Sequence, residues 1–524
     1  MLTKILDSLG EENPQLVREL KGRLNRRSVG IVLFLSALFQ CLIVGFHSEK
    51  NCIAWSDNNA GGLCQHYHRV IQWEFAFQSL SFILPLLLFA GGVYLLISDL
   101  GKEQRRGTLN FLRLSPRSSQ NILLGKLLGV PVLLYLGVGL VVPLHLLCAI
   151  ASGIPLAWVY GFYAVLAALG ALIYTALLLN AFLLNQVQYQ AIASSALAGW
   201  FSSCFFTFVL SYFSWDESKL RGFRLKWFFW EDLGRNYHLG FFWLFLSLLV
   251  GNYWMWQGLN RQFKNPNSTL LSKAQSYGVI ASLQVWMLGF FYPVMNQAHV
   301  EETLMPIMLG MSILTVSIFL LIIPAISPQR QTLLDWARYA HEDRRQGLKG
   351  YSKWQDWIWG EKSPSVVAIA INLGIVAALW MPWILLGKGG FYAKLTAGVA
   401  LVMTLNLIWI YSAIAQSLYL IKFPKPGLLA MGMVMVTLSL PPLVFGLLSQ
   451  TVSVNITLWM LFVFGSPWLA LTEASAMAIF VSLLGQLAAI ATLTLTLNHQ
   501  IHKAGVSHSK LLFAANPTQI APKV

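Results

Sequence analysis

Charged side chains are scarce in this sequence of 524 residues. Asp, Glu, Lys and Arg make up 11% of the chain, whereas hydrophobic residues make up 56%. Soluble domains usually carry about 25% charged residues. The shortage excludes a protein whose surface lies mostly in water, and lipid is the remaining solvent. We therefore expect an all-α, polytopic integral membrane protein.

Cysteine is also scarce, with five residues in the chain, which excludes a scaffold built on disulfides. Cys52 and Cys64 lie in a segment expected on the outer side, where an oxidising compartment favours a disulfide between them. The segment also reads Cys64-x-His66-x-His68. That spacing matches no standard zinc pattern, so we expect no metal there.

Long apolar runs dominate the rest of the chain. A helix needs roughly 20 apolar residues to cross the hydrocarbon core. Twelve runs meet this requirement and predict about twelve transmembrane helices: 28–46, 74–97, 128–150, 158–184, 191–213, 239–256, 276–295, 304–326, 366–386, 395–415, 428–448 and 476–497. A shorter run at 457–470 contains Gly465 and Pro467 and is interpreted as re-entrant or interfacial.

The basic residues predict the orientation of these spans. With the N-terminus in the cytoplasm, 27 of the 36 Lys and Arg residues fall on the cytoplasmic side, which the positive-inside rule favours for both termini. The outer loop 214–238 is the exception, since it is basic and aromatic. We interpret it as an amphipathic segment on the outer membrane surface, with a misplaced span as the alternative. Because the net charge of +15 is spread over loops, no nucleic-acid partner is expected.

The same order of spans and loops occurs twice in the chain. The long cytoplasmic loops 98–127 and 327–365 each follow the second span of a set of six. Duplicated halves are common in transporters, where the substrate path lies between them. We therefore expect two six-helix halves, with these boundaries: a cytoplasmic amphipathic helix at 1–27, a first half at 28–260, a linker at 261–275, a second half at 276–497 and a cytoplasmic tail at 498–524.

Two cytoplasmic segments carry helix signals. Asn13 suits a helix cap and Pro14 the first helical position, ahead of an amphipathic stretch that would lie along the headgroups. After the second span, a short helix is expected from about Thr108 to Leu114, where Ser115-Pro116 ends it. Ser118 or Ser119 then caps a helix that leads into the third span. The result is a helix-turn-helix elbow.

The elbow resembles the coupling segment of type 2 ATP-binding-cassette (ABC) export permeases in its motif and in its position between spans 2 and 3. The resemblance implies that the ATPase-coupling residues are Glu103, Arg105, Arg106, Gly107, Thr108, Leu112, Ser115, Pro116, Gly125 and Lys126. The chain departs from the family at Asn110, where members typically have an acidic residue. The second half resembles the family in topology, with 361–364 as a degenerate second docking site.

The resemblance also implies which parts are elsewhere. A phosphate-binding loop needs G-x-x-x-x-G-K-[ST], and every Gly-Lys pair in the chain lacks the following Ser or Thr. The chain would thus be a transport permease without catalytic residues or a cofactor of its own. ATP and Mg would bind to a separate P-loop ATPase at the cytoplasmic face of a prokaryotic plasma membrane. Whether a second permease copy completes the pathway stays open.

Two other classes of protein are compatible with the spans. A secondary, ion-coupled transporter also has twelve, and Asp99-Leu-Gly-Lys-Glu-Gln-Arg-Arg is superficially similar to its signature, although Leu95 stands where that signature has Gly. A membrane-embedded transferase needs clustered carboxylates or His/Asp groups at one face, and no such cluster stands out. His145 lies deep in a span, where we expect a hydrogen bond to a neighbouring helix.

Overall fold

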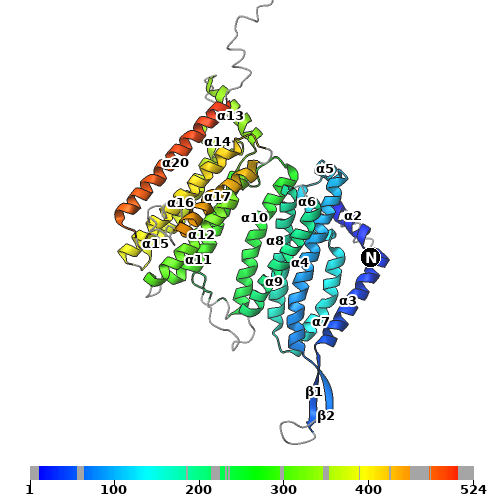
Figure 1. Cartoon of the computed structure of the whole chain (residues 1–524). Coiled ribbons are helices and arrows are strands. Elements are labelled where there is room, and N and C mark those ends of the chain that lie inside the picture. The colour runs from blue at the N-terminus through cyan, green and yellow to red at the C-terminus, as the bar shows by residue number, and fades with distance from the viewer. Residues whose placement is uncertain are drawn as a thin grey trace, which may run out of the picture. The chain divides into compact units, whose positions relative to one another are not determined.

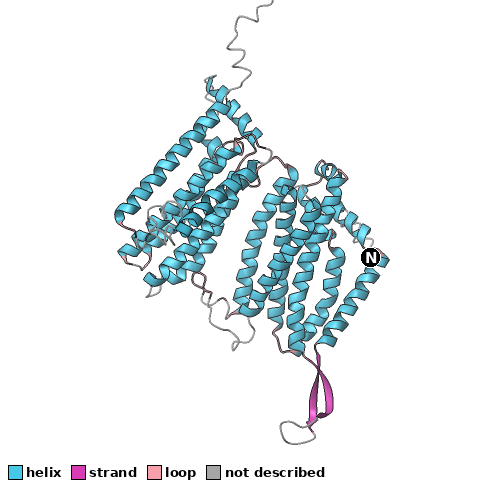
Figure 2. Ribbon diagram, viewed as in Figure 1, coloured by secondary structure: helices cyan, strands magenta, loops and turns pink. Residues whose placement is uncertain are grey.

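The computed structural model describes most of the chain as helices, in two compact units (Figures 1 and 2). Unit 1 comprises residues 1–225 and 232–266, and unit 2 comprises 226–231 and 267–524. The boundary at 266 falls within the predicted linker. The structure describes residues 11–55, 64–184, 187–213, 225–230, 233, 236–295, 300–345, 353–388, 390–423, 426–448, 471 and 474–505.

Unit 1 contains the amphipathic helix, the elbow and six long helical stretches. In chain order these are α2 (Pro14–Arg23), α3 (Arg26–Phe46), α4 (Trp73–Arg105), α5 (Thr108–Arg113), α6 (Ser119–Gly129), α7 (Val132–Ala151), α8 (Leu156–Leu184), α9 (Val187–Tyr212) and α10 (Tyr237–Lys264). The predicted third span is divided into α6 and α7 at Pro131, because proline has no backbone N–H to continue the helix.

Unit 2 begins directly with a long helix. Its elements are α11 (Lys273–Met295), α12 (Val300–Ile326), α13 (Arg330–Arg345), α14 (Lys353–Trp359), α15 (Val366–Leu386), α16 (Phe391–Tyr419), α17 (Pro426–Leu448) and α20 (Ala476–Gly505). The predicted long loop 327–365 therefore contains two helices, α13 and α14.

Within the described residues, ten helices are long and apolar enough to cross a membrane. They correspond to ten of the twelve predicted spans, so the chain is an all-α polytopic membrane protein apart from one small hairpin. The predicted spans 276–295 and 428–448 form α11 and α17, which are not among the ten. The described apolar part of α17 is the shorter stretch Leu429–Leu440. The run 457–470 lies outside the described residues.

Three helices continue past the predicted ends of their apolar spans. α4 extends through the predicted loop 98–127 as far as Arg105, and α10 extends into the predicted linker as far as Lys264. α20 takes up the beginning of the predicted tail and ends at Gly505. Hydrogen bonds along a helix do not require apolar side chains, so polar turns can extend a span into the aqueous phase.

The core of unit 1 forms around α4, which packs against α7, α8 and α9, while α8 packs against α10. Gly92 of α4 leaves space for Tyr174 of α8, whose hydroxyl donates a hydrogen bond of 2.6 Å to the Leu88 carbonyl. His145 is fully buried and hydrogen-bonded through both ring nitrogens, to Ser81 at 2.9 Å and Tyr163 at 2.7 Å. The prediction that His145 bonds neighbouring helices is confirmed.

A two-stranded hairpin follows α3, and the sequence analysis did not predict it. Strands β1 (Ser48–Trp55) and β2 (Cys64–Ile71) pair antiparallel and project from the end of unit 1 opposite to α5 (Figure 1). The register places Cys52 opposite Tyr67, and Cys64 opposite Trp55. The two cysteines are therefore not cross-strand partners, and the disulfide between them stays a prediction that needs another register.

Part of the basic, aromatic loop 214–238 packs on unit 2. Trp227 and Trp230 form an isolated bridge around Phe228, whose φ is 48°. The Phe228 backbone N–H donates to the Gly289 carbonyl of α11 at 2.7 Å. These residues thus form a tight turn attached to a helix. The rest of the predicted amphipathic segment lies mostly outside the described residues.

Candidate functional site

The elbow of unit 1, residues 103–126, is built by three local signals. Gly107 has a φ of 72°, the left-handed region that glycine adopts without steric cost, and it separates α4 from α5. Ser115-Pro116 ends α5, as predicted. The Ser118 hydroxyl then accepts a hydrogen bond of 3.3 Å from the Asn121 N–H and caps α6. The predicted helix, break and cap are therefore confirmed.

The two faces of α5 differ sharply in exposure. Leu109 and Leu112 are 4% and 9% exposed and fix the helix to the unit. On the other face, Phe111 and Leu114 are 77% and 85% exposed. Residues three apart in a helix share a face, so these two side chains form one outward apolar pair. The elbow also exposes three basic residues near this pair in the sequence: Arg105, Arg106 and Arg117.

Arg113 attaches α5 to the ends of two further helices. Its guanidinium carbon lies 5.7 Å from the ring centroid of Phe182 in α8 and 5.8 Å from that of Phe263 in α10. Both distances are within the range of a cation–π interaction. Burial lowers the pKa of Arg113. The Ser119 hydroxyl donates to the Asn260 side-chain oxygen, which adds a second link to α10.

Helix α2 lies against α6 over two glycines. A Cβ at Gly125 would come within 2.8 Å of the Leu16 backbone N, and one at Gly129 within 2.6 Å of the Glu19 Cβ. Small residues permit such a close approach between helices. Asn13 caps α2 as predicted, accepting from the Leu16 N–H at 3.0 Å, and its amide also donates to the Asn121 carbonyl at 2.8 Å. The start of α2 is thereby fixed to the start of α6.

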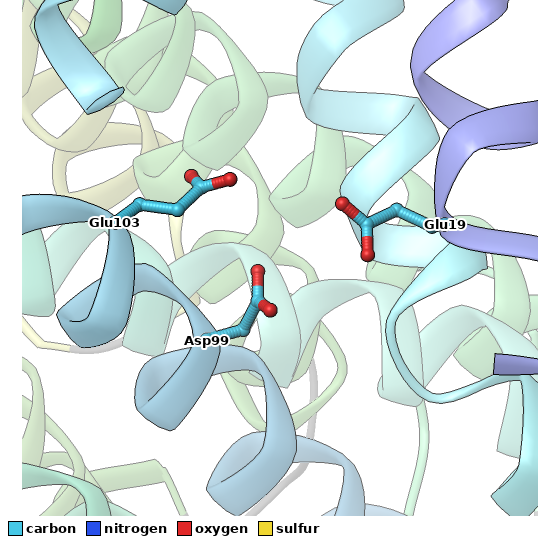
Figure 3. A group of neighbouring side chains, drawn as sticks. All are labelled: Glu19, Asp99 and Glu103. Carbon is cyan, nitrogen blue, oxygen red and sulfur yellow. The ribbon is translucent and has the colours of Figure 1, made fainter. Parts of the chain in front are cut away.

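A network of charged side chains joins α2, α4 and α6. The carboxylates of Glu19, Asp99 and Glu103 point toward one another (Figure 3). The buried Lys126 ammonium lies 2.8 Å from Asp99 Oδ2 and 2.7 Å from Glu103 Oε2. Arg23 bonds Asp99 at 2.7 Å, with Glu19 3.3 Å from its Nε.

The same network contains a third cation. Arg18 bridges Glu19 and Glu103, both at 3.0 Å. Burial acts to lower the pKa of Arg18, but hydrogen bonds and charge from Glu19 and Glu103 outweigh it and raise the pKa. Three carboxylates thus face three cations from this chain. Their spacing would also suit a metal ion, but the positive charge that they need is already supplied by Lys126, Arg23 and Arg18.

The structure divides the predicted coupling residues into two groups. The first is exposed on the elbow surface and comprises Arg105, Arg106, Gly107, Thr108 and Pro116. The second faces inward, wholly or in part, and supports the elbow: Glu103, Leu112, Ser115, Gly125 and Lys126. Leu112 is the α5 residue that the motif selects, yet it anchors the helix, while Phe111 and Leu114 occupy the outer face.

Sequence reasoning missed Phe111, Leu114, Glu19 and the pairing of Asp99. A six-residue helix is too short for periodicity to reveal which face is exposed. The ion pairs join residues far apart in the chain, and no local pattern specifies them. The one available signal was a Glu within the apolar face of α2, at a position where an unpaired charge would be costly.

The predicted second docking site in unit 2 is built differently. Lys273, at the start of α11, is buried and donates to the Trp357 carbonyl, the Ser363 hydroxyl and the Pro364 carbonyl, at 2.8, 2.6 and 3.1 Å. Ser363 and Pro364 are therefore buried, while Glu361 and Lys362 are exposed. The predicted site 361–364 has no counterpart to the exposed pair of α5.

Trp336 and Trp357 of the same loop contact each other, with ring centroids 5.2 Å apart, and Trp336 donates to Asp356 at 2.5 Å. These contacts hold α13 against α14.

No protein-family model, curated protein or solved structure matches the chain.

Proposed function

We propose that the chain is the membrane-spanning permease subunit of an ABC exporter, and that a separate ATPase docks on α5. The observation that carries the proposal is the outward apolar pair Phe111–Leu114 on an elbow that is anchored to several spans. The ATPase supplies ATP hydrolysis with Mg, and the permease moves its substrate outward. This chain contributes no catalytic group.

The chemistry of the α5 surface suits a protein partner. Two large apolar side chains are exposed on an elbow that also exposes Arg105, Arg106 and Arg117. Protein interfaces are enriched in aromatic residues and Arg, with an apolar centre and a polar rim. The complementary ATPase surface would be an apolar groove with an acidic rim. The competing explanation is that the pair anchors α5 in lipid headgroups.

The anchoring of the elbow supports a role in force transmission. α4 continues without a break from the span to Arg105, and α6 is separated from α7 only by Val130 and Pro131. Arg113 adds contacts to α8 and α10. Because packed helices move as rigid elements, a displacement of α5 would be passed to four long helices at once.

A repeated packing pattern supports two six-helix halves. In unit 1, α3 packs against α7, α4 against α8 and α9, and α8 against α10. In unit 2, α11 packs against α15, α12 against α16 and α17, and α16 against α20. These four pairings correspond when both sets are numbered in chain order, whereas the packing of α4 on α7 and of α11 on α12 has no such counterpart among the described residues of the other unit. We therefore propose twelve spans, with α11 and α17 added to the ten apolar helices.

The distribution of carboxylates disfavours ion coupling. Among the ten candidate spans of the described residues, acidic side chains occur only in α4, at Glu74, Asp99 and Glu103. All three lie near its ends, and the last two are paired with cations. Proton-coupled transporters usually need ionisable groups deep in the membrane. We further propose that the chain lies in a prokaryotic plasma membrane, with α5 and the N-terminus on the cytoplasmic side.

The test is co-purification from native membranes. The tagged chain is extracted in mild detergent, and mass spectrometry asks whether a P-loop ATPase accompanies it. We expect a stoichiometric ATPase with the wild type and its loss from Phe111→Ala/Leu114→Ala. The control Phe391→Ala/Leu395→Ala also removes an exposed aromatic residue and an exposed leucine, which are 76% and 52% exposed on α16.

Three results would count against the proposal. The absence of an ATPase after crosslinking would favour a secondary transporter, and proton-driven uptake would be assayed next. Equal loss from both double variants would mean that exposed apolar residues act generally. If the α5 variant retains the ATPase but α5 itself is less firmly attached to the membrane surface, the result would support lipid anchoring by Phe111 and Leu114.

A further inference from the structure

We propose that unit 1 binds the phosphate headgroup of an anionic membrane lipid in a cavity between the hairpin and the ends of α3 and α7. The site lies at the end of the unit opposite to α5 (Figure 1). The inference does not depend on the proposed ATPase partner, since it uses different residues at a different end of the helices.

The cavity has a volume of about 600 Å³. Binding sites for small ligands commonly enclose about 300–1,000 Å³, so this volume accommodates a headgroup. Three elements line it: α3, the hairpin and α7. Their lining residues include Gln40, Cys41 and Val44 of α3, Lys50 and Arg69 of the hairpin, and Leu144 of α7.

Two positive charges meet across the hairpin in this cavity. The strand register places Lys50 directly opposite Arg69, and both line the cavity. Like charges at directly opposed positions destabilise a strand pair. Glu49 is the neighbouring carboxylate in β1, but successive strand residues point to opposite faces, and Glu49 accepts a hydrogen bond from Gln72 at 2.5 Å.

Neither cation has an ion-pair partner among the residues that the structure describes. The contrast with the other end of the unit is direct, because there Lys126, Arg18 and Arg23 each face a carboxylate. An anion bound between Lys50 and Arg69 would remove their mutual repulsion. A phosphate is the best match, since Arg presents a planar donor fork and Lys a point charge.

The walls of the cavity favour a lipid over a free phosphate. Val44 and Leu144 contribute apolar surface beside the two cations. α3 is a candidate span, and its outward residues Leu42 and Phe46 are 62% and 85% exposed. Acyl chains would follow this apolar face while the headgroup entered the cavity. A soluble phosphate ester has no acyl chains to contact this apolar face.

The position along the helix fits the depth of a headgroup. α3 ends at Phe46, and the hairpin that carries both cations starts two residues later, at Ser48. The cavity therefore lies where the apolar span ends. Lipid phosphates lie at this boundary, where basic side chains are attracted to anionic lipids.

The test uses the full-length chain purified in mild detergent. Native mass spectrometry compares retention of phosphatidylglycerol with that of phosphatidylcholine. We expect Lys50→Ala/Arg69→Ala to weaken phosphatidylglycerol binding about 30-fold, from the contribution of two basic residues near an anionic headgroup. Lys50→Arg/Arg69→Lys keeps both charges and should retain binding. Lys388→Ala/Lys394→Ala removes two cations elsewhere and should match the wild type.

Cys41 reports whether the lipid occupies this cavity. It is exposed and lines the cavity, so maleimide labelling can be followed on its own chymotryptic peptide, Gln40–Phe46, which the double variant keeps. Phosphatidylglycerol in phosphatidylcholine nanodiscs should slow the labelling of the wild type and leave Lys50→Ala/Arg69→Ala unaffected. Equal labelling with and without phosphatidylglycerol would overturn the proposal. Protection by soluble glycerophosphate alone would replace the lipid with a free phosphate ester.

Discussion

Replacing Gly125 by alanine should detach α2 from the elbow. The added Cβ would lie 2.8 Å from the Leu16 backbone N, 2.8 Å from the Asn13 side-chain oxygen and 3.0 Å from the Gln15 Cβ. A backbone atom cannot rotate out of the way, so α2 itself must move. Restoring an ordinary contact of 3.4 Å requires a retreat of roughly 0.6 Å.

Opposing contributions set the magnitude. Overpacking costs about 1–3 kcal/mol, and the retreat stretches the 2.8 Å bond from Asn13 to the Asn121 carbonyl, which contributes about 1 kcal/mol. Alanine favours the helical state of α6 by about 1 kcal/mol over glycine. We therefore expect α2 to be held about 1–3 kcal/mol less tightly, which is about 5- to 150-fold in the detached population.

The assay is amide hydrogen exchange over residues 14–23, because local detachment exposes those N–H groups. Gly139→Ala in α7 is the matched control, since a Cβ there would meet nothing within 4 Å. We expect the amide exchange of α2 to be faster in Gly125→Ala than in the wild type. In Gly139→Ala it should be unchanged. The same exchange rate in both variants would refute the inferred close packing of α2 on α6.

Three further predictions concern other parts of the chain. Lys126→Met should loosen α6 from α4 by about 2 kcal/mol, since it removes the ion pairs to Asp99 and Glu103 that join these helices; faster amide exchange over 119–129 with unchanged exchange in α5 checks it. Replacing Gly107 and Pro116 together should uncouple transport without preventing membrane insertion, with about 1–2 kcal/mol of strain from a side chain at φ 72°; a transport assay beside a membrane-fraction blot decides it. Burial lowers the pKa of Lys273 from 10.5 to about 8. Between these values the unfolded chain holds more protons, so stability should rise with pH across that window, and Lys273→Met should lose this rise in thermal unfolding.

The cytoplasmic elements could largely be predicted because short-range signals define them. Asn13, Ser115-Pro116 and Ser118 act on backbone groups within a few residues of themselves, so sequence alone located α2, α5 and α6. The ends of the spans were harder to predict. α4 and α10 continue as polar turns, and hydropathy gives no sign of where such a turn stops.

The partners within the site could not be predicted because they are distant in sequence. Lys126 meets Asp99 and Glu103 only because α6 returns beside α4, and Glu19 joins them from before the first span. The hairpin had an available signal, since β-branched and aromatic residues occur in 48–55 and 64–71. The segment was interpreted through its Cys and His residues as possible ligands, and the strand pattern was not used.

In the proposed function, docking and transmission would depend on different residues, so the two steps can be tested separately. Phe111 and Leu114 form the outer face of α5 and contribute little to its anchoring, whereas Gly125 and Gly129 of α6 pack closely against α2 from the inner side. The attachment of α2 depends on its close contact with Gly125 and Gly129 and on the ion pairs of Arg18 and Arg23 with α4. A docking variant should therefore lose the ATPase altogether. A transmission variant such as Gly125→Ala should keep a bound ATPase that hydrolyses ATP without transport. If Gly125→Ala instead loses the ATPase while α5 stays intact, α2 is itself part of the docking surface.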